Sequence, residues 1–448
     1  MLESSNLEAL RFYDSSGELG YDFDREEVVT AAPVRRLQQK TQVYPLDIKA
    51  SSRSRLTHSL EVQCRVAAVV AALARRNDFY SDHLYEIVSI CETAALVHDV
   101  GNPPFGHFGE NVIVSFFSKY LDELYAMSLG AEGEMSRQWK NLLKPDLANF
   151  DGNAQNLRIL HSIQKLNLSA QVLASCIKVP YLADESVDGE LGCFYSESVL
   201  LQFVREAFEL EPGERFELAR LLEYADNISY ALADIEDAAD RGLVDMDDLK
   251  RDLRSYCNSP GAELFDEIVL ECSKRGCSFT GYFRRNCMQR AIEAFAEGYN
   301  AALETAGGDD FSFDGADGPN DLLHAMSLYA REKIFKCREI EALELTGNAA
   351  LRGILKIYSR LLALPRADFQ QLLRGKELPD PILGRLFRRI SPRVLSAYKE
   401  AVSGGDLEFE NDGEKEFYFR VRLIIDYVTG MTDTYIHAEF SLLSGLDV

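Results

Sequence analysis

The sequence has little of what would place it in a membrane, a disulfide framework or a zinc site. No apolar run approaches the roughly 20 residues of a spanning helix, and the first 20 residues lack the basic start and apolar stretch of a signal peptide. Nine cysteines are scattered singly, and the one close pair, Cys272 and Cys277, has no second pair beside it. This unpatterned set favours reduced thiols in the cytoplasm, most of them as small apolar core residues.

Positive charge is also scarce. The chain has 48 Lys and Arg against 72 Asp and Glu, a net charge of −24 over 448 residues. Such a surface repels phosphate backbones and anionic lipid, which argues against duplex DNA and membranes as partners. A small anionic substrate remains compatible with a locally positive site. The compact basic cluster APVRRLQQK (32–40) leaves room for single-stranded DNA in a local groove.

Convincing strand signals are few, and apolar residues mostly recur at helical spacing. The segments that predict helices are 58–76, 84–97, 214–238, 263–272 and 422–443. Residues 192–198 and a stretch near 408–420 could be short strands or irregular, and the Gly- and Asp-rich 305–321 indicates a linker or surface loop. We expect an all-α protein with a helical core over 1–240 and a packed helical extension over 241–448.

The few histidines lie where chemistry is plausible. The chain has seven, and His58 and His98 each stand at the end of an apolar helix beside charged or small residues. His98 is followed by Asp99, and a later helix carries Asp226 with Tyr230 at i+4 on one face. Two imidazoles and two carboxylates suit a catalytic metal with open positions for water and phosphate. Taken singly, each is more often a core histidine or a capping aspartate.

The joint pattern resembles the HD-domain deoxynucleoside triphosphate triphosphohydrolases, typified by bacterial dGTP triphosphohydrolase. The resemblance covers most of the chain and follows family order through segments 21–43, 53–62, 98–110, 150–160, 223–238 and 426–435. It implies an HD-domain helical core. It also implies one divalent metal per site, Mn, Mg, Co or Fe, held by His58, His98, Asp99 and Asp226.

The resemblance also gives roles to the loop HDVGNPPFGHFGE (98–110). It implies that His107 sits beside the scissile phosphate and Glu110 beside His107. The residues alone allow this, since a histidine can carry a proton to a leaving alkoxide and a nearby carboxylate can fix its tautomer. Pro103 and Pro104 would stiffen the loop. The alternative is that NPPFG is only a rigid turn.

The resemblance further places six residues beside the substrate: Gln42, Arg55, Asn153, Lys178, Tyr230 and Asp234. Arg55 and Lys178 match phosphate contacts, although such residues are usually solvated surface charges. Tyr230, Asp234 and Gln42 match positions near the sugar. Val179 replaces a tyrosine that the family usually has after this lysine, so the pocket differs locally.

The implied reaction is hydrolysis of a deoxynucleoside triphosphate, with dGTP the leading candidate, to deoxynucleoside and inorganic triphosphate. The family implies a homo-oligomer, a hexamer or tetramer, and room for a nucleotide activator. One alternative is another HD phosphohydrolase; dinuclear members need extra histidines, and the remaining four do not match family positions (His83, His161, His324 and His437). Another is a non-catalytic nucleotide-sensing protein on the HD scaffold.

Overall fold

The computed structural model describes residues 2–13, 20–46, 52–130, 135–185, 191–276, 279–306 and 318–445. Within these ranges the chain is helical with no strand, and two isolated bridges pair Arg11 with Ser169 and Thr41 with Ser54. The prediction of an all-α protein is therefore confirmed.

The first half of the chain forms helices around a three-helix centre. Its α-helices are α1 (Tyr21–Thr30), α2 (Ala32–Arg36), α3 (Arg55–Ala74), α4 (Asp78–Asp82), α5 (Leu84–Val97), α6 (Gly106–Leu129), α7 (Lys144–Ala148), α8 (Gly152–Leu157), α9 (Ala170–Ser175), α10 (Ser198–Phe208) and α11 (Glu217–Asp240). Helices α3, α5 and α11 pack against one another, and Val62, Val66, Val69 and Leu73 of α3 are fully buried. Burying each such side chain contributes about 1.5–3 kcal/mol.

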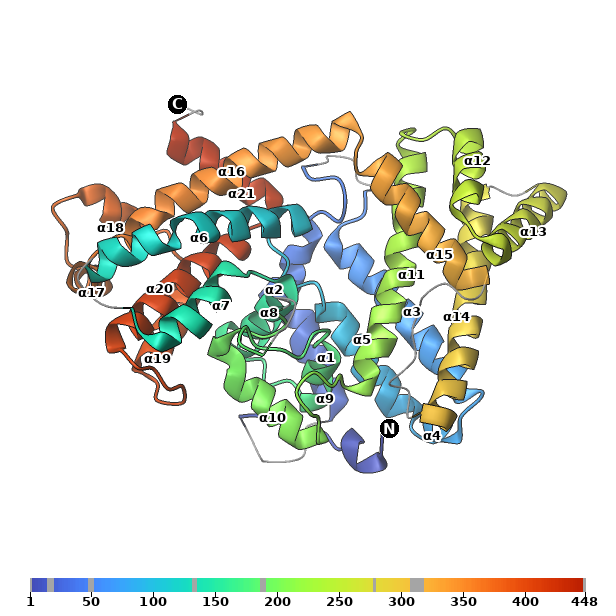
Figure 1. Cartoon of the computed structure of the whole chain (residues 1–448), viewed down its shortest axis with the longest axis horizontal. Coiled ribbons are helices and arrows are strands. Elements are labelled where there is room, and N and C mark those ends of the chain that lie inside the picture. Colours follow the sequence, from blue (N-terminus) through green and yellow to red (C-terminus); the bar gives the residue numbers. More distant parts are fainter. Residues whose placement is uncertain are drawn as a thin grey trace.

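The second half packs on the first from two sides (Figure 1). Its α-helices are α12 (Met246–Tyr256), α13 (Ser259–Arg275), α14 (Phe279–Ala306), α15 (Gly318–Tyr329), α16 (Arg338–Leu362), α17 (Arg366–Leu373), α18 (Pro381–Phe387), α19 (Pro392–Ser403), α20 (Asp412–Thr429) and α21 (Asp433–Ser444). The group α12–α15 lies beside α3 and α11, whereas the long α16 runs along α6 and covers α20 and α21. The division at 240/241 stays a prediction.

Most predicted helices appear where periodicity placed them. The segment 84–97 is α5, and the segments 58–76, 214–238 and 263–272 lie largely within α3, α11 and α13. The segment 422–443 is interrupted, because α20 ends at Thr429 and the side chain of Thr432 caps a new helix at the N–H of Tyr435. Neither possible strand forms: Tyr195–Glu197 is a 3₁₀ turn, and α20 takes up the second half of 408–420. Most of the predicted linker, 307–317, lies outside the described residues.

Helix α3 is long and apolar enough to cross a membrane by length and composition. Half of its apolar window is buried inside the protein, where it packs against α5, α11 and α14. A core helix commonly passes the same test, so this feature is weak evidence for a membrane segment.

Candidate active site

Two histidines and one aspartate from three parts of the chain meet beside the central helices. His58 lies in the first turn of α3, His98 directly follows α5, and Asp226 lies midway along α11. One possible ligand atom from each lies within 4.8 Å of the others. His58 Nε2 lies 2.9 Å from Asp226 Oδ1, and His98 Nε2 lies 3.5 Å from the same oxygen. Imidazole nitrogens and carboxylate oxygens are ligands that suit a divalent metal.

Local structure orients both imidazoles. The hydroxyl of Ser54 accepts the N–H of Thr57 and caps α3, so His58 projects from a well-formed first turn. His98 Nδ1–H donates to the carbonyl of Ala95 at 2.7 Å, which leaves the Nε2 lone pair toward the cluster. That buried Nε2 accepts no hydrogen bond from the described residues. Metal-binding histidines are usually oriented in this way, so the residues fit a bound divalent ion.

Asp99 lies beside this cluster. Its Oδ1 is 3.7 Å from His98 Nε2 and also accepts from the side-chain amide of Asn102, while its Oδ2 accepts from Arg55 Nη1 at 2.8 Å. Three of the four predicted ligands are thus brought together, and Asp99 is adjacent and paired with a cation. Its role as a ligand stays a prediction.

The cations around the cluster keep its carboxylates charged. Lys178 Nζ donates to Asp226 Oδ2 at 2.7 Å. Burial alone would raise the pKa of Asp226, but the positive charge of Lys178 outweighs burial, so this pKa lies well below its usual range. Burial would also raise the pKa of Asp99, but the positive charge of Arg55 outweighs burial and lowers this pKa. Charged carboxylates are the form that binds a metal.

His107 and Glu110 form a pair on the first turn of α6. His107 Nδ1–H donates to Glu110 Oε2 at 2.7 Å, and Glu110 Oε1 accepts the N–H of Gly152 at 3.0 Å. The bond to Glu110 raises the pKa of His107. The His107 side chain is 81% exposed, so the ring can reach a bound ligand. Gly106 before it has φ +57°, and a Cβ there would lie 2.4 Å from Nη2 of Arg55.

Two of the residues predicted to hold the sugar, Asp234 and Gln42, present buried acceptor oxygens. Asp234 is fully buried one turn beyond Tyr230, and neither of its carboxylate oxygens accepts a hydrogen bond in the described part of the chain. Burial raises the pKa of Asp234 well above its usual range. Gln42 Oε1 is also buried without a partner there. Asn153 lies in the first turn of α8, where its N–H donates to the capping carboxylate of Asp151, and no hydrogen bond among the described residues joins its side chain to the metal cluster.

Comparison with known proteins places the chain among characterised families. A model of the HD domain matches residues 55–171. The deoxyguanosinetriphosphate triphosphohydrolase of Serratia proteamaculans is 33% identical over 98% of this chain and 96% of its own length. The probable deoxyguanosinetriphosphate triphosphohydrolase of Pseudomonas aeruginosa is 34% identical over 94% of this chain and 92% of its own length. The deoxyguanosinetriphosphate triphosphohydrolase of Salmonella typhimurium is 31% identical over 95% of this chain and 94% of its own length. The chain belongs to the deoxyguanosinetriphosphate triphosphohydrolase family.

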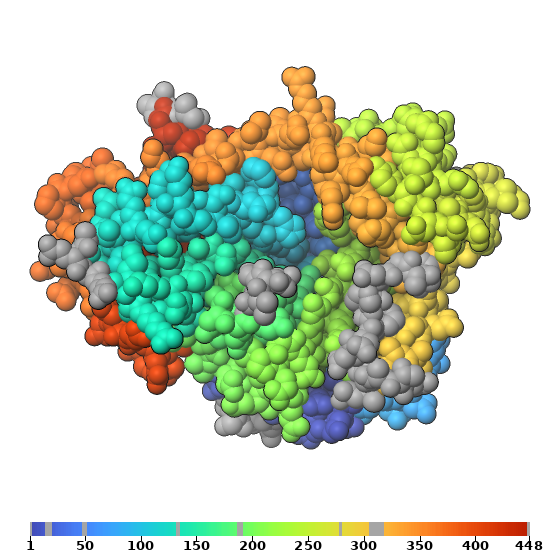
Figure 2. Space-filling model, in the orientation of Figure 1, coloured from blue at the N-terminus to red at the C-terminus, as the bar shows by residue number. Residues whose placement is uncertain are grey.

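The HD-domain match covers only part of the site of this family member. His58, His98, Asp99, His107 and Glu110 lie inside the matched range. Asp226 and Lys178 follow it, and Gln42 precedes it. In Figure 2 the surface is hollowed between the start of α6, the helices α15 and α16, and α11, with early residues of the chain at its floor. These are the elements that carry or adjoin the site.

Several residues around the loop 98–105 have no role that the sequence predicted. Lys40 is buried, and its Nζ donates to the carbonyls of Asn102 and Thr429, to the latter at 2.9 Å. Burial lowers the pKa of Lys40 to about 7. Asp433 accepts from the N–H groups of Thr41 and Phe105. Lys40 and Asp433 lie within motifs that support the resemblance, but no spacing rule links residues so far apart.

The predicted basic cluster at 32–40 lines a separate cavity, here called the arginine pocket. Its volume is about 870 Å³, and Arg35, Arg36, Arg389 and Arg393 line it. Arg389 is paired with Glu439, whereas Arg36 has no hydrogen bond or ion pair from its guanidinium to any described residue. Burial, followed by Arg393 and Arg35, lowers the pKa of Arg36. The pocket is therefore locally positive in an acidic protein.

Proposed function

We propose that this protein hydrolyses deoxynucleoside triphosphates, with dGTP the leading candidate, to deoxynucleoside and inorganic triphosphate. The observation that carries the proposal is the meeting of His58, His98 and Asp226 beside two cations, Arg55 and Lys178. A metal-type donor set flanked by cations suits a phosphate ester. The relatives named above carry the corresponding activity in their names.

One divalent ion, Mg, Mn, Co or Fe, would be held by His58, His98, Asp99 and Asp226. When bound, it would supply Lewis-acid stabilisation of phosphate charge and a more acidic water. The chain contributes the orientation of the donors: the Ala95 carbonyl fixes the tautomer of His98. Arg55 and Lys178, now paired with the ligand carboxylates, would face the triphosphate and neutralise it.

His107 would be the proton carrier. Its Nδ1–H is occupied by Glu110, so Nε2 is the nitrogen that can give a proton to the departing 5′-oxygen of the nucleoside. Glu110 is itself held by the N–H of Gly152, which fixes the pair relative to α8. Attack at the α-phosphorus would leave the triphosphate intact.

Asp234, Gln42 and Tyr230 would select the deoxyribose. The oxygens of Asp234 and Gln42 are buried acceptors without a partner in the described structure, a costly arrangement that a 3′-hydroxyl donor would relieve. The ring of Tyr230, on the same helix, would pack under the sugar and leave no room for a 2′-hydroxyl. Asn153 would line the same region.

The test is turnover of each of the four dNTPs, with GTP as the control substrate, in Mn or Mg, with products separated by ion exchange. Release of triphosphate from dNTPs and little from GTP, lost in Asp99→Ala and retained in His83→Ala, supports the proposal. His83 is a matched control because it bonds Ser4 away from the cluster. Release of pyrophosphate or orthophosphate would favour another HD phosphohydrolase. Metal binding without turnover, even with mixed dNTPs, would favour a nucleotide-sensing protein.

The arginine pocket would receive a nucleotide activator. Arg36 brings an unpaired cation to it, and three more arginines surround the cavity. Arg36→Met should abolish stimulation of dGTP turnover by a second dNTP, whereas Arg25→Met, which removes an exposed cation paired with Glu92, should not. The homo-oligomer, tetramer or hexamer, would be measured by light scattering with and without the nucleotide.

A further inference from the structure

The loop between α5 and α6, which carries the residues from His98 to Phe105, is held by residues more than 300 positions later. Asp433, the first residue of α21, accepts the N–H of Phe105 on Oδ1 at 3.0 Å. Its Oδ2 accepts both the N–H, at 2.9 Å, and the hydroxyl of Thr41. Asp433 is 1% exposed, so water does not compete for these bonds. One carboxylate thus joins three segments of the chain.

The hydrogen bond to Asp433 bears on the backbone conformation of Phe105. Phe105 has φ 66°, in the left-handed region that a residue with a Cβ rarely adopts, and it is the cap residue of α6, two positions before His107. Such a backbone persists only when its surroundings fix it. The bond from its N–H to Asp433 does so from one side. From the other, α16 brings Gly347 so close that a Cβ there would lie 2.8 Å from the ring of Phe105.

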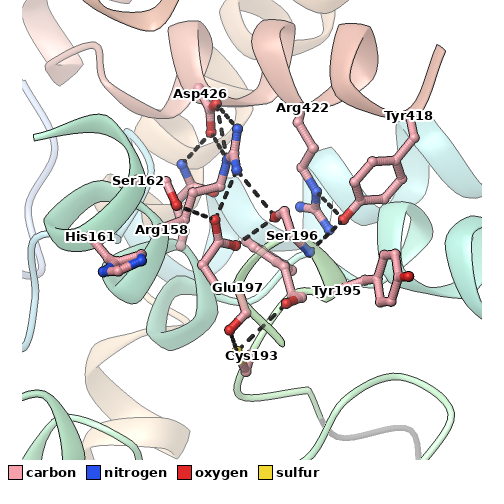
Figure 3. Close-up of polar contacts among 12 residues, drawn as sticks. Arg158, His161, Ser162, Cys193, Tyr195, Ser196, Glu197, Tyr418, Arg422 and Asp426 are labelled. Atoms are coloured by element: carbon pink, nitrogen blue, oxygen red, sulfur yellow. Dashed lines mark hydrogen bonds and ion pairs between the residues drawn. The ribbon is translucent and has the colours of Figure 1, made fainter. Parts of the chain in front are cut away.

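The end of α20, directly before Asp433, is itself anchored. Figure 3 shows Asp426 of α20 held by Arg158, which also reaches Glu197 and Ser196. Asp426 further accepts from the side chain of Gln155 on α8 at 2.9 Å. The same short helix begins at Gly152, whose N–H holds Glu110. The His107–Glu110 pair is therefore tied to the C-terminal helices at both its ends.

We propose that Asp433 is a positioning residue for His107. It fixes the strained backbone of Phe105 and so sets the direction of the first turn of α6. This inference rests on the proposed role of His107. It gives the C-terminal helix α21 a function at the active site.

The test compares Asp433→Asn with His437→Gln, an exposed residue one turn along the same helix. Asparagine keeps one acceptor but cannot accept from both Phe105 and Thr41. We expect kcat for dGTP to fall about 10- to 100-fold, the range for a catalytic group displaced by about 1 Å, with KM and Mn affinity within threefold of wild type. Amide hydrogen exchange in segment 102–112 should rise in Asp433→Asn and stay unchanged in His437→Gln.

Gly347→Ala disturbs Phe105 from the opposite side and leaves Asp433 in place. It should give the same fall in kcat at unchanged KM, which keeps the proposal testable if Asp433→Asn folds poorly. A kcat within twofold of wild type in both variants, or a parallel loss of kcat, Mn affinity and global stability, would overturn the proposal. If the wild type itself does not turn over dNTPs, the proposed function fails, and hydrogen exchange alone decides whether Asp433 holds the loop.

Discussion

Replacing the buried Arg158 by methionine should destabilise the protein strongly. Arg158 is 2% exposed and donates to Asp426 from Nε at 2.8 Å and from Nη2 at 2.7 Å, and to Glu197 from Nη1 at 2.9 Å. Its removal leaves two carboxylates in the interior with only neutral donors, the amide of Gln155 and the hydroxyls of Ser162 and Ser196. Removing one partner of a buried ion pair typically costs about 3–5 kcal/mol.

An exposed pair of the same chain supplies the matched control. Lys165 pairs with Glu400, and both side chains are about half exposed. Water screens such a pair, so Lys165→Met should cost less than about 1 kcal/mol. Urea unfolding followed by far-ultraviolet circular dichroism, at one protein concentration, gives both values. Because one buried charge is then removed with the cation, the double variant Arg158→Met/Asp426→Asn should cost less than the sum of its two single variants.

An Arg158→Met variant that is no more destabilised than Lys165→Met would contradict this prediction. That result would mean that water reaches Asp426 and Glu197, or that their charge is otherwise compensated. Additive costs in the double variant would equally refute the idea that Arg158 and Asp426 act as one buried unit.

Three further predictions concern the site and its surroundings. Glu110→Gln keeps an acceptor for the N–H of Gly152 but removes the charge that raises the pKa of His107. The fall of kcat with rising pH should therefore begin at a lower pH in this variant. A pH profile of kcat that matches the wild type would contradict this prediction. Gly101→Ala would put a Cβ 2.0 Å from the carbonyl oxygen of Gly152. We expect the free energy of unfolding in urea to fall by about 1–3 kcal/mol and most dGTP turnover to be lost. A variant with wild-type stability and turnover would refute the close approach. Burial lowers the pKa of His161 to about 4, so the unfolded chain binds a proton at this residue before the folded chain does, and the free energy of unfolding falls as pH drops from about 6.5 towards 4. Between pH 7 and 5 the wild type should lose about 1 kcal/mol more of this free energy than His161→Gln. Equal losses in the two proteins would exclude this contribution.

The sequence predicted five helical segments because their signal is local, whereas the long helices α6, α14 and α16 were not among them. In α3 and α5 the apolar residues repeat on one face, and the side chain that caps α3, Ser54, stands beside the first turn. The interruption at 430–432 escaped prediction because the apolar pattern continues across it. Only the cap that Thr432 forms with the N–H of Tyr435 reveals that a second helix begins there.

Residue types and motif order also indicated the candidate site. The predicted ligands His58, His98 and Asp226 do meet, although 168 positions separate His58 from Asp226. Periodicity could not show this, since it says which face of a helix is buried and not which helix covers that face. The pairing of Asp99 with Arg55 and of Asp226 with Lys178 likewise depends on how α3 and α11 pack against the segments that follow α5 and α9.

By itself, then, the sequence determined the all-α class and the positions of the helical segments with clear periodicity, and it indicated the residue types of the candidate site, because these depend on local spacing and on which side chains are present. Tertiary structure alone decided which charges are buried. Arg158, Asp426 and Asp433 would each be read as surface residues from their type, yet packing puts them inside. A buried charge is tolerated only where folding brings its partner, and that partner lies far away in the chain.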